Sequence, residues 1–296
     1  MIKIHSIATL FIASQIVASA QEEINLRVSN FARPLAEKWA TEYAQQTGVK
    51  INFVGASTTT PNTISLVTSD AIADDEETVY FGRYAVLPVV NKDSEAEQLL
   101  SGKRLNAKKL KNIFFVKDEF DDDKKESKAE RELHIYSGNG KLSVSRSYAT
   151  HFSHVAADYK GKRISGDDIF LNSALSRDPL GITINTISNI FDLNTRQLRS
   201  GLSLVSLDLG RHADEVFDTA NLDNIIALLE SDNFDEIAIG NAGLAYDHNN
   251  TTLNDFVRWI LTNGNQYVHE FGLLQLTQKD LATQMRRTEL RQLALK

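Results

Sequence analysis

The sequence predicts an α/β protein of two lobes, and three observations lead to that prediction. The chain has 296 residues, of which 42% are apolar and 24% charged, which is enough to build two buried cores. Its N-terminal part has the order strand, helix, strand, which is typical of a parallel pair with a right-handed crossover. The run from Thr78 to Asn91 is too long and too apolar for an edge strand, so we expect it to pass through the interior between the lobes.

The first 20 residues have the pattern of a signal peptide for export. Lys3 supplies positive charge, residues 7–17 form a short apolar core, and residues 18–20, with sequence ASA, are typical of a cleavage site before Gln21. The alternative is an uncleaved amphipathic anchor, which is disfavoured because the apolar core is too short to span a bilayer and acidic residues follow it directly. We therefore expect a protein exported to the periplasm.

Composition excludes several function classes. The chain has no cysteine, which rules out disulfides, thiolate metal sites and a lipid-modified cysteine after the leader. The formal net charge of −7 argues against a general nucleic-acid binder and against a polybasic membrane-surface protein. His151 and His154 have no third candidate ligand near them in sequence, so we expect no metal and no cofactor.

The predicted first lobe begins with a strand at 24–28, a helix at 32–46 and a strand at 49–54. Gly48 ends the helix, whose apolar residues recur every four positions as Leu35, Trp39 and Tyr43. Ligands of open α/β sheets lie beyond the carboxyl ends of the strands. The segments at those ends are Ser29-Asn30-Phe31 and the hydroxyl-rich residues 55–60.

The predicted second lobe continues with short helices at 95–100 and 106–114 and a charged insertion at 117–132. A strand at 133–136 then leads into a helix that opens near Ser143, with an apolar stripe of Val144, Tyr148, Phe152 and Val155. Asp167 is placed to cap a helix at 169–175. Further strands are expected at 182–185 and 202–207.

The turn Ser137-Gly138-Asn139-Gly140-Lys141 has the properties of an anion-binding loop. It joins a strand to a helix, so several backbone N–H groups point at one place in front of the helix dipole. Glycines allow close backbone approach, and Ser and Asn side chains add hydrogen bonds to an oxyanion. Many short turns of this composition are ordinary helix caps, so the pattern alone leaves both interpretations open.

An ordered set of motifs resembles the periplasmic phosphate-binding proteins of bacterial ABC importers. The opening segments 31–43, 47–48 and 50–53, with Gly55, resemble the family's turn, its K-W-A helix that ends in T-G, and its strand that leads to a glycine-serine loop. Ser69-Asp70-Ala71 resembles its S-D-A-P motif, and Pro88-Val89-Val90-Asn91 resembles the start of its second lobe. The closing segments 256–261, 264–267 and 272–276 resemble its C-terminal pattern.

The resemblance implies a type II periplasmic binding protein, in which each lobe is a mixed sheet flanked by helices. The first lobe would comprise 21–85 and 221–296 and the second 86–220, with hinge crossings near 85 and 220. Phosphate or a related oxyanion would bind between the lobes. The implied first-lobe ligands are Asn30, Phe31, Ser57, Thr58 and Asp70, and the second-lobe ligands are Ser137, Gly138, Asn139, Gly140, Lys141 and Arg146.

The second-lobe loop departs from the family pattern R-x-D-G-S-G-T. Ile135 stands at the position of the arginine and Ser137 at that of the aspartate, so the guanidinium that balances a dianion is missing. A divalent anion in a closed cleft needs a cation as well as N–H donors. Lys141, Arg146 and Arg83 are the candidate replacements.

The sequence has no G-x-S-x-G, H-E-x-x-H, P-loop or Rossmann motif, and the expected loops carry hydroxyls and amides, which suits binding better than catalysis. We predict a monomeric solute-binding protein, not an enzyme, that delivers phosphate to the membrane permease of an ABC importer. The alternative hypothesis is a fold of this type without phosphate affinity, acting as an interaction module in the envelope.

Overall fold

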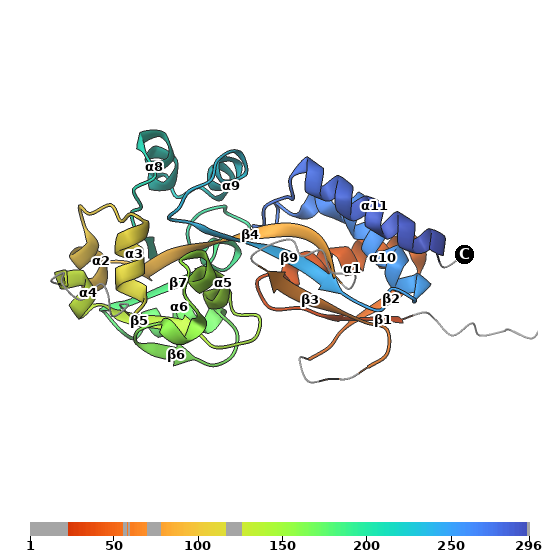
Figure 1. Cartoon of the computed structure of the whole chain (residues 1–296), viewed down its shortest axis with the longest axis horizontal. Helices are drawn as coiled ribbons and strands as arrows, with labels where there is room; N and C mark the ends of the chain where they lie inside the picture. The colour runs from red at the N-terminus through yellow and green to blue at the C-terminus, as the bar shows by residue number, and fades with distance from the viewer. Residues whose placement is uncertain (1–22, 56–57, 59, 70–77, 117–125, 295–296) are drawn as a thin grey trace, which may run out of the picture.

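The computed structural model describes residues 23–55, 58, 60–69, 78–116 and 126–294 (Figure 1). The expected signal peptide, Ser57 and Asp70 lie outside the described residues. Among the helices that the structure does describe, none is long and apolar enough to cross a membrane.

The described strands form one nine-stranded mixed sheet. Its strands, in chain order, are β1 (Glu23–Arg27), β2 (Lys50–Phe53), β3 (Thr63–Ser69), β4 (Thr78–Asn91), β5 (His134–Gly138), β6 (Lys162–Ile164), β7 (Gly181–Thr186), β8 (Leu202–Leu204) and β9 (Ala238–Ala245). The order across the sheet is β2-β1-β3-β9-β4-β7-β5-β6, and β8 pairs with β4.

Helices cover this sheet in both halves of the molecule (Figure 1). They are α1 (Arg33–Thr47), α2 (Glu95–Leu100), α3 (Ala107–Phe114), α4 (Lys128–Glu132), α5 (Val144–His151), α6 (Ile169–Leu175), α7 (Ile187–Ile190), α8 (Arg211–Asp218), α9 (Leu222–Ser231), α10 (Thr251–Thr262) and α11 (Gln278–Ala294). Figure 1 shows β1, β2 and β3 with α1, α10 and α11 in one half, which we call the first lobe. The second lobe holds β5, β6 and β7 with α2 to α6.

The long strands β4 and β9 connect the two lobes (Figure 1). They pair antiparallel from Thr78 opposite Ala245 to Val86 opposite Ala238. Beyond Val86, β4 continues in the second lobe as the antiparallel partner of β7. The predicted fold class, a two-lobed mixed α/β protein, is confirmed, while the predicted lobe boundaries and hinge motion stay predictions.

The N-terminal β-α-β unit forms as predicted. β1 and β2 are parallel, with Ile24 opposite Ile51. α1 buries the predicted stripe of Leu35, Trp39 and Tyr43 against the core, because these residues recur at helical spacing. The Trp39 indole also donates a hydrogen bond of 2.9 Å to the carbonyl of Gly264, which ties α1 to the C-terminal part of the chain.

Gly48 ends α1 in the left-handed conformation, with φ of 77°. A Cβ at this position would meet no heavy atom within 4 Å, so a substitution tests backbone conformation alone. Gly48→Ala is expected to lower the free energy of unfolding by about 1–2 kcal/mol, because L-residues avoid this region. Urea denaturation measures the change. Gly48→Asn is the matched control and should cost less, since Asn tolerates left-handed backbone; equal losses for the two variants would contradict the explanation.

The second-lobe helix α5 differs from its prediction at the C-terminal end. Val144 and Tyr148 are buried as expected, but Val155 is 62% exposed. The helix ends at His151, and Ser153 adopts a positive φ of 61°. The apolar spacing therefore does not continue as one helical face.

Candidate ligand-binding site

A cavity of about 380 Å³ lies between the lobes. The first lobe lines it with Arg27, Val28, Ser29 and Phe31, at the end of β1 and the turn after it. The second lobe lines it with residues 140–143, which follow β5, residues 166–168, which follow β6, and Asn189 of α7. β1 has parallel partners and β5 is parallel to β6, so the cavity lies at carboxyl ends of parallel strands.

Two of the predicted first-lobe ligands lie at this cavity or beside it. Phe31 lines the cavity, and its ring centroid lies 5.3 Å from that of Tyr84 on β4. The Asn30 N–H, which was predicted to bind the oxyanion, donates instead to Oδ2 of Asp167 at 3.1 Å. The Thr58 carbonyl accepts a hydrogen bond from Arg27, and Thr58 is not part of the lining.

The predicted second-lobe turn is divided between the cavity and the interior. Gly140 and Lys141 line the cavity. Ser137 is buried, and its Oγ has no hydrogen-bond partner among the described residues. The Gly138 N–H donates to Oγ of Ser145 at 2.8 Å, and the Asn139 N–H donates to the carbonyl of Ile164 at 3.1 Å. Neither of these two N–H groups points free into the cavity.

The carboxylate of Asp168 occupies the N-terminus of α5. Its Oδ2 accepts from the Val144 N–H at 2.8 Å and its Oδ1 accepts from Oγ of Ser143 at 2.7 Å. Gly138 permits this approach, because a Cβ there would overlap both the Asp168 carboxylate and the Ser143 hydroxyl. The donors that an oxyanion would use at this helix end are therefore taken by a side chain of the same lobe.

Asp168 is only 7% exposed, and burial raises the pKa of its carboxyl to about 6. The hydrogen bonds from Ser143 and Val144 lower the pKa by less than burial raises it, and the charge of Asp167 adds to the increase. The Asn185 amide donates to the backbone carbonyl of Asp168 at 2.8 Å and so helps to fix its position.

Asp167 connects the two lobes. Its Oδ2 accepts from Asn30 of the first lobe, and its Oδ1 accepts from the Ile169 N–H at 3.1 Å. The second contact agrees with the predicted role in starting α6, although the residue directly before the helix is Asp168. The first contact means that a carboxylate of the second lobe takes an N–H of the first lobe.

Of the three cations that were proposed from the sequence, one lines the cavity. Lys141 lines it, whereas Arg146 is not part of the lining and Arg83 donates to the carbonyl of Gln275 at 2.8 Å. Arg27 lines the cavity although it was not a candidate. Its guanidinium donates to the carbonyls of Gly55 and Thr58 and to Oγ of Ser65.

Sequence reasoning missed Arg27, Asp167 and Asp168 as residues of the site. A signal was present for each, because all three follow or end a strand whose carboxyl end faces the cavity. Asp167 was instead interpreted as the cap of a helix, and Asp168 was given no role.

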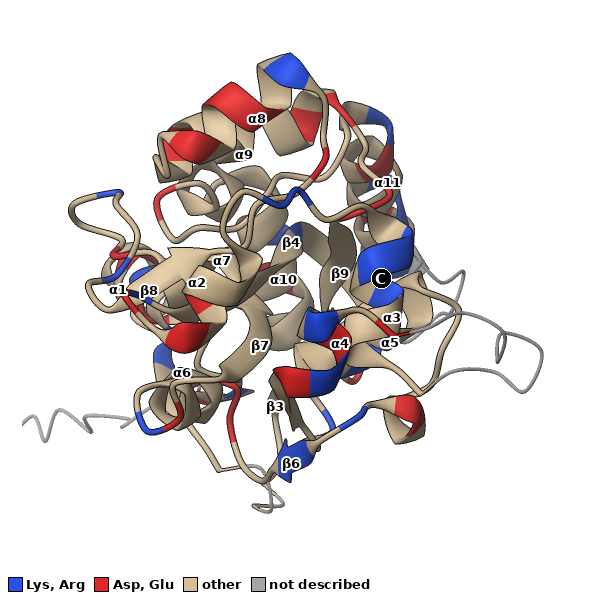
Figure 2. Cartoon of the chain, turned by 90° about the vertical axis from the view of Figure 1, so that its left-hand side faces the viewer, with Lys and Arg blue, Asp and Glu red and all other residues tan. Residues whose placement is uncertain are grey.

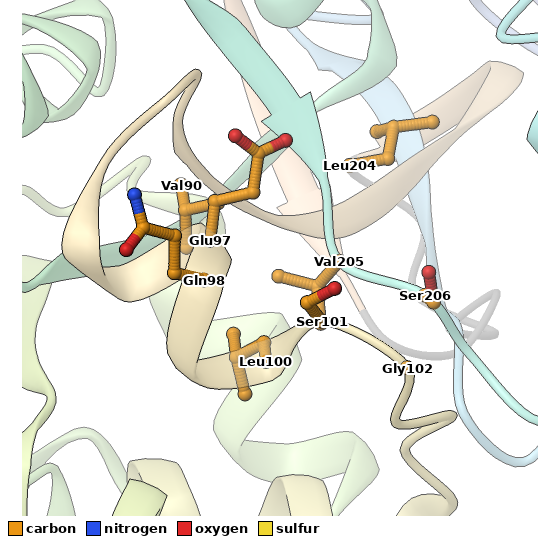
Figure 3. A pocket seen from close by; sticks show the side chains of 9 residues that line it. All are labelled: Val90, Glu97, Gln98, Leu100, Ser101, Gly102, Leu204, Val205 and Ser206. Atoms are coloured by element: carbon orange, nitrogen blue, oxygen red, sulfur yellow. The ribbon is translucent and has the colours of Figure 1, made fainter.

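A second cavity, of about 340 Å³, lies within the second lobe (Figure 3). Figure 3 shows its lining coming from α2 and the residues after it on one side and from residues 204–206 on the other. Glu97 is its charged residue, and that carboxylate accepts hydrogen bonds from the Asp93 N–H and the Ser203 hydroxyl. Because this lining belongs to one half of the molecule, the cavity between the lobes is the better candidate site.

The charges on the second-lobe end are mixed in sign (Figure 2). Figure 2 shows acidic residues on α8 and basic residues on β6. No group of three or more potential metal ligands is found among the described residues.

The sequence matches no family model, and no curated protein matches it. Solved structures do match. An ABC-type phosphate transport receptor from Vibrio cholerae is 11% identical with a TM-score of 0.55, and the match covers 86% of this chain and 100% of that one. A structure from Clostridium perfringens, described as a candidate phosphate ABC transporter substrate-binding protein with bound phosphate, is 12% identical with a TM-score of 0.59 and the same coverage. The likeness shows that this chain has the fold of these substrate-binding proteins.

Proposed function

We propose that this chain is an exported solute-binding protein that captures its ligand between the two lobes and presents it to the membrane permease of an ABC importer. The fold and a cavity lined by both lobes support this role. A ligand that contacts both lobes would bind more tightly to the closed arrangement than to the open one, and it would therefore shift the population toward the closed arrangement. No reaction is part of the proposal.

The ligand that we propose is not the phosphate dianion. One observation carries this: the N–H groups of Asn30 and Val144, which an oxyanion would need, already donate to Asp167 and Asp168. A dianion would have to displace these carboxylates or lie beside them. Two unit charges at 4 Å repel by about 4 kcal/mol in partly buried surroundings, so these two carboxylates oppose the binding of a dianion.

Calorimetric titration of residues 21–296 at pH 7.5 tests the proposal. We expect no saturable binding of phosphate or of sulfate at about 1 mM, which corresponds to less than about 4 kcal/mol of binding free energy. A phosphate dissociation constant in the micromolar range would contradict this expectation. It would favour the phosphate receptor that the sequence predicted.

A further inference from the structure

The size and lining of the cavity between the lobes fit an organic ligand. A volume of about 380 Å³ falls in the range of about 300–1,000 Å³ that is typical of small-molecule sites and exceeds the needs of an inorganic oxyanion. Val28, Phe31 and Leu142 give the cavity apolar wall residues from both lobes. Such a wall favours a ligand with an apolar body.

The charged side chains that line the cavity differ in how many hydrogen-bond and ion-pair partners they have. Asp167 and Asp168 each accept two hydrogen bonds from the protein. Lys141 is exposed and has no hydrogen bond or ion pair with any residue that the structure describes. Arg27 donates to two carbonyls and a hydroxyl, which leaves its positive charge without a carboxylate partner in the described part of the chain.

A polar group of the first lobe also lacks a partner at this place. Ser29 lines the same cavity, and its Oγ is buried beside it and forms no hydrogen bond within the described residues. A buried hydroxyl without a partner is costly, and a ligand oxygen would satisfy it.

We propose that this cavity binds a small organic acid with one carboxylate and an apolar body. The carboxylate pairs with Lys141 and Arg27 and accepts from Ser29, and the body packs on Phe31 and Leu142. The inference rests on the proposed function, because it names the ligand class of that receptor.

Other ligand classes fit the same residues less well. A cationic ligand would need free carboxylates, and those of Asp167 and Asp168 are already hydrogen-bonded. A neutral ligand would leave two cations unpaired in a partly enclosed cavity. A dianion would place two negative charges near the carboxylates of Asp167 and Asp168, whereas a monocarboxylate places one there and packs its apolar body on the apolar wall residues.

Titration calorimetry with hexanoate and phenylacetate, their amides hexanamide and phenylacetamide, and inorganic phosphate tests this inference. We expect at least one of the two carboxylates to bind and to bind at least about tenfold more tightly than its amide. Equal affinity for acid and amide would overturn the charge recognition, and failure of both acids would overturn the inference. Phosphate binding without carboxylate binding would overturn both this inference and the exclusion of phosphate in the proposed function, whereas failure of every probe overturns the inference alone.

Lys141→Gln is the decisive variant, since the exposed side chain makes no contact on which folding depends. It should weaken binding of the better acid about tenfold. Arg27→Lys keeps the positive charge, so it should weaken binding less than Lys141→Gln does. Arg146→Gln is the matched control, because it removes one positive charge from an exposed residue of α5 outside the lining. An equal loss in Lys141→Gln and Arg146→Gln would reduce the effect to long-range charge and overturn the site.

Discussion

An Asp167→Ala/Asp168→Ala double variant is expected to bind inorganic phosphate at least about 100-fold more tightly than the wild-type protein. The substitutions free the N–H groups of Asn30 and Val144 and the hydroxyl of Ser143. They also remove two negative charges from the lining. A 100-fold gain corresponds to about 2.7 kcal/mol, which is less than the repulsion that one carboxylate exerts on a unit charge at 4 Å.

The matched control for this gain is Asp208→Ala/Asp235→Ala. These two aspartates are exposed and lie outside the lining, so the control changes the net charge by the same amount. Calorimetric titration with phosphate at pH 7.5 compares the three proteins, and circular dichroism checks that each is folded. A gain of equal size in the control would assign the effect to net charge, and no gain in the cavity variant would show that the carboxylates do not exclude phosphate.

The second large effect concerns the pH dependence of stability. Burial raises the pKa of Asp168 from 3.8 to about 6, so the folded protein holds this proton more tightly than the unfolded chain does. A group with a raised folded-state pKa contributes its full stability below the unfolded pKa and loses it as the pH rises through the folded pKa. Between pH 4 and pH 8 the contribution of Asp168 should therefore fall by about 2–3 kcal/mol.

Asp168→Asn isolates this contribution from the other titrating groups. The difference in free energy of unfolding between wild type and variant, measured by urea denaturation at several pH values, should shift against the wild type by that amount as the pH rises. Several carboxyls elsewhere, among them Asp158 and Glu230, have lowered pKa values, and their opposite effect cancels in the difference. If the free energies of unfolding of the two proteins changed in parallel with pH, folding would not raise the pKa of Asp168.

The fold could largely be predicted because local patterns determine its main elements. The apolar run at 78–91 forms β4 with the same bounds, since a strand buried on both faces needs unbroken apolar sequence. Gly48 ends α1 because the left-handed conformation favours glycine. Val155 was assigned wrongly because spacing alone does not show that the backbone turns at Ser153.

The candidate site could be predicted only in part, for a physical reason. Strand ends identified Phe31, Gly140 and Lys141, which do line the cavity. The contact between Asn30 and Asp167 joins residues 137 positions apart, and no local pattern reports such a contact. The sequence therefore indicated where N–H donors gather but could not show that a carboxylate of the same chain reaches them first.

Strand β4, which is part of both lobes, also affects how the protein unfolds. β4 is hydrogen-bonded to β9 from Thr78 to Val86 and to β7 from Val86 to Val90, so one strand belongs to the hydrogen-bonded core of both halves. If either half lost its strands, the part of β4 that they cover would become exposed to solvent. We therefore expect the two halves to unfold as one cooperative unit.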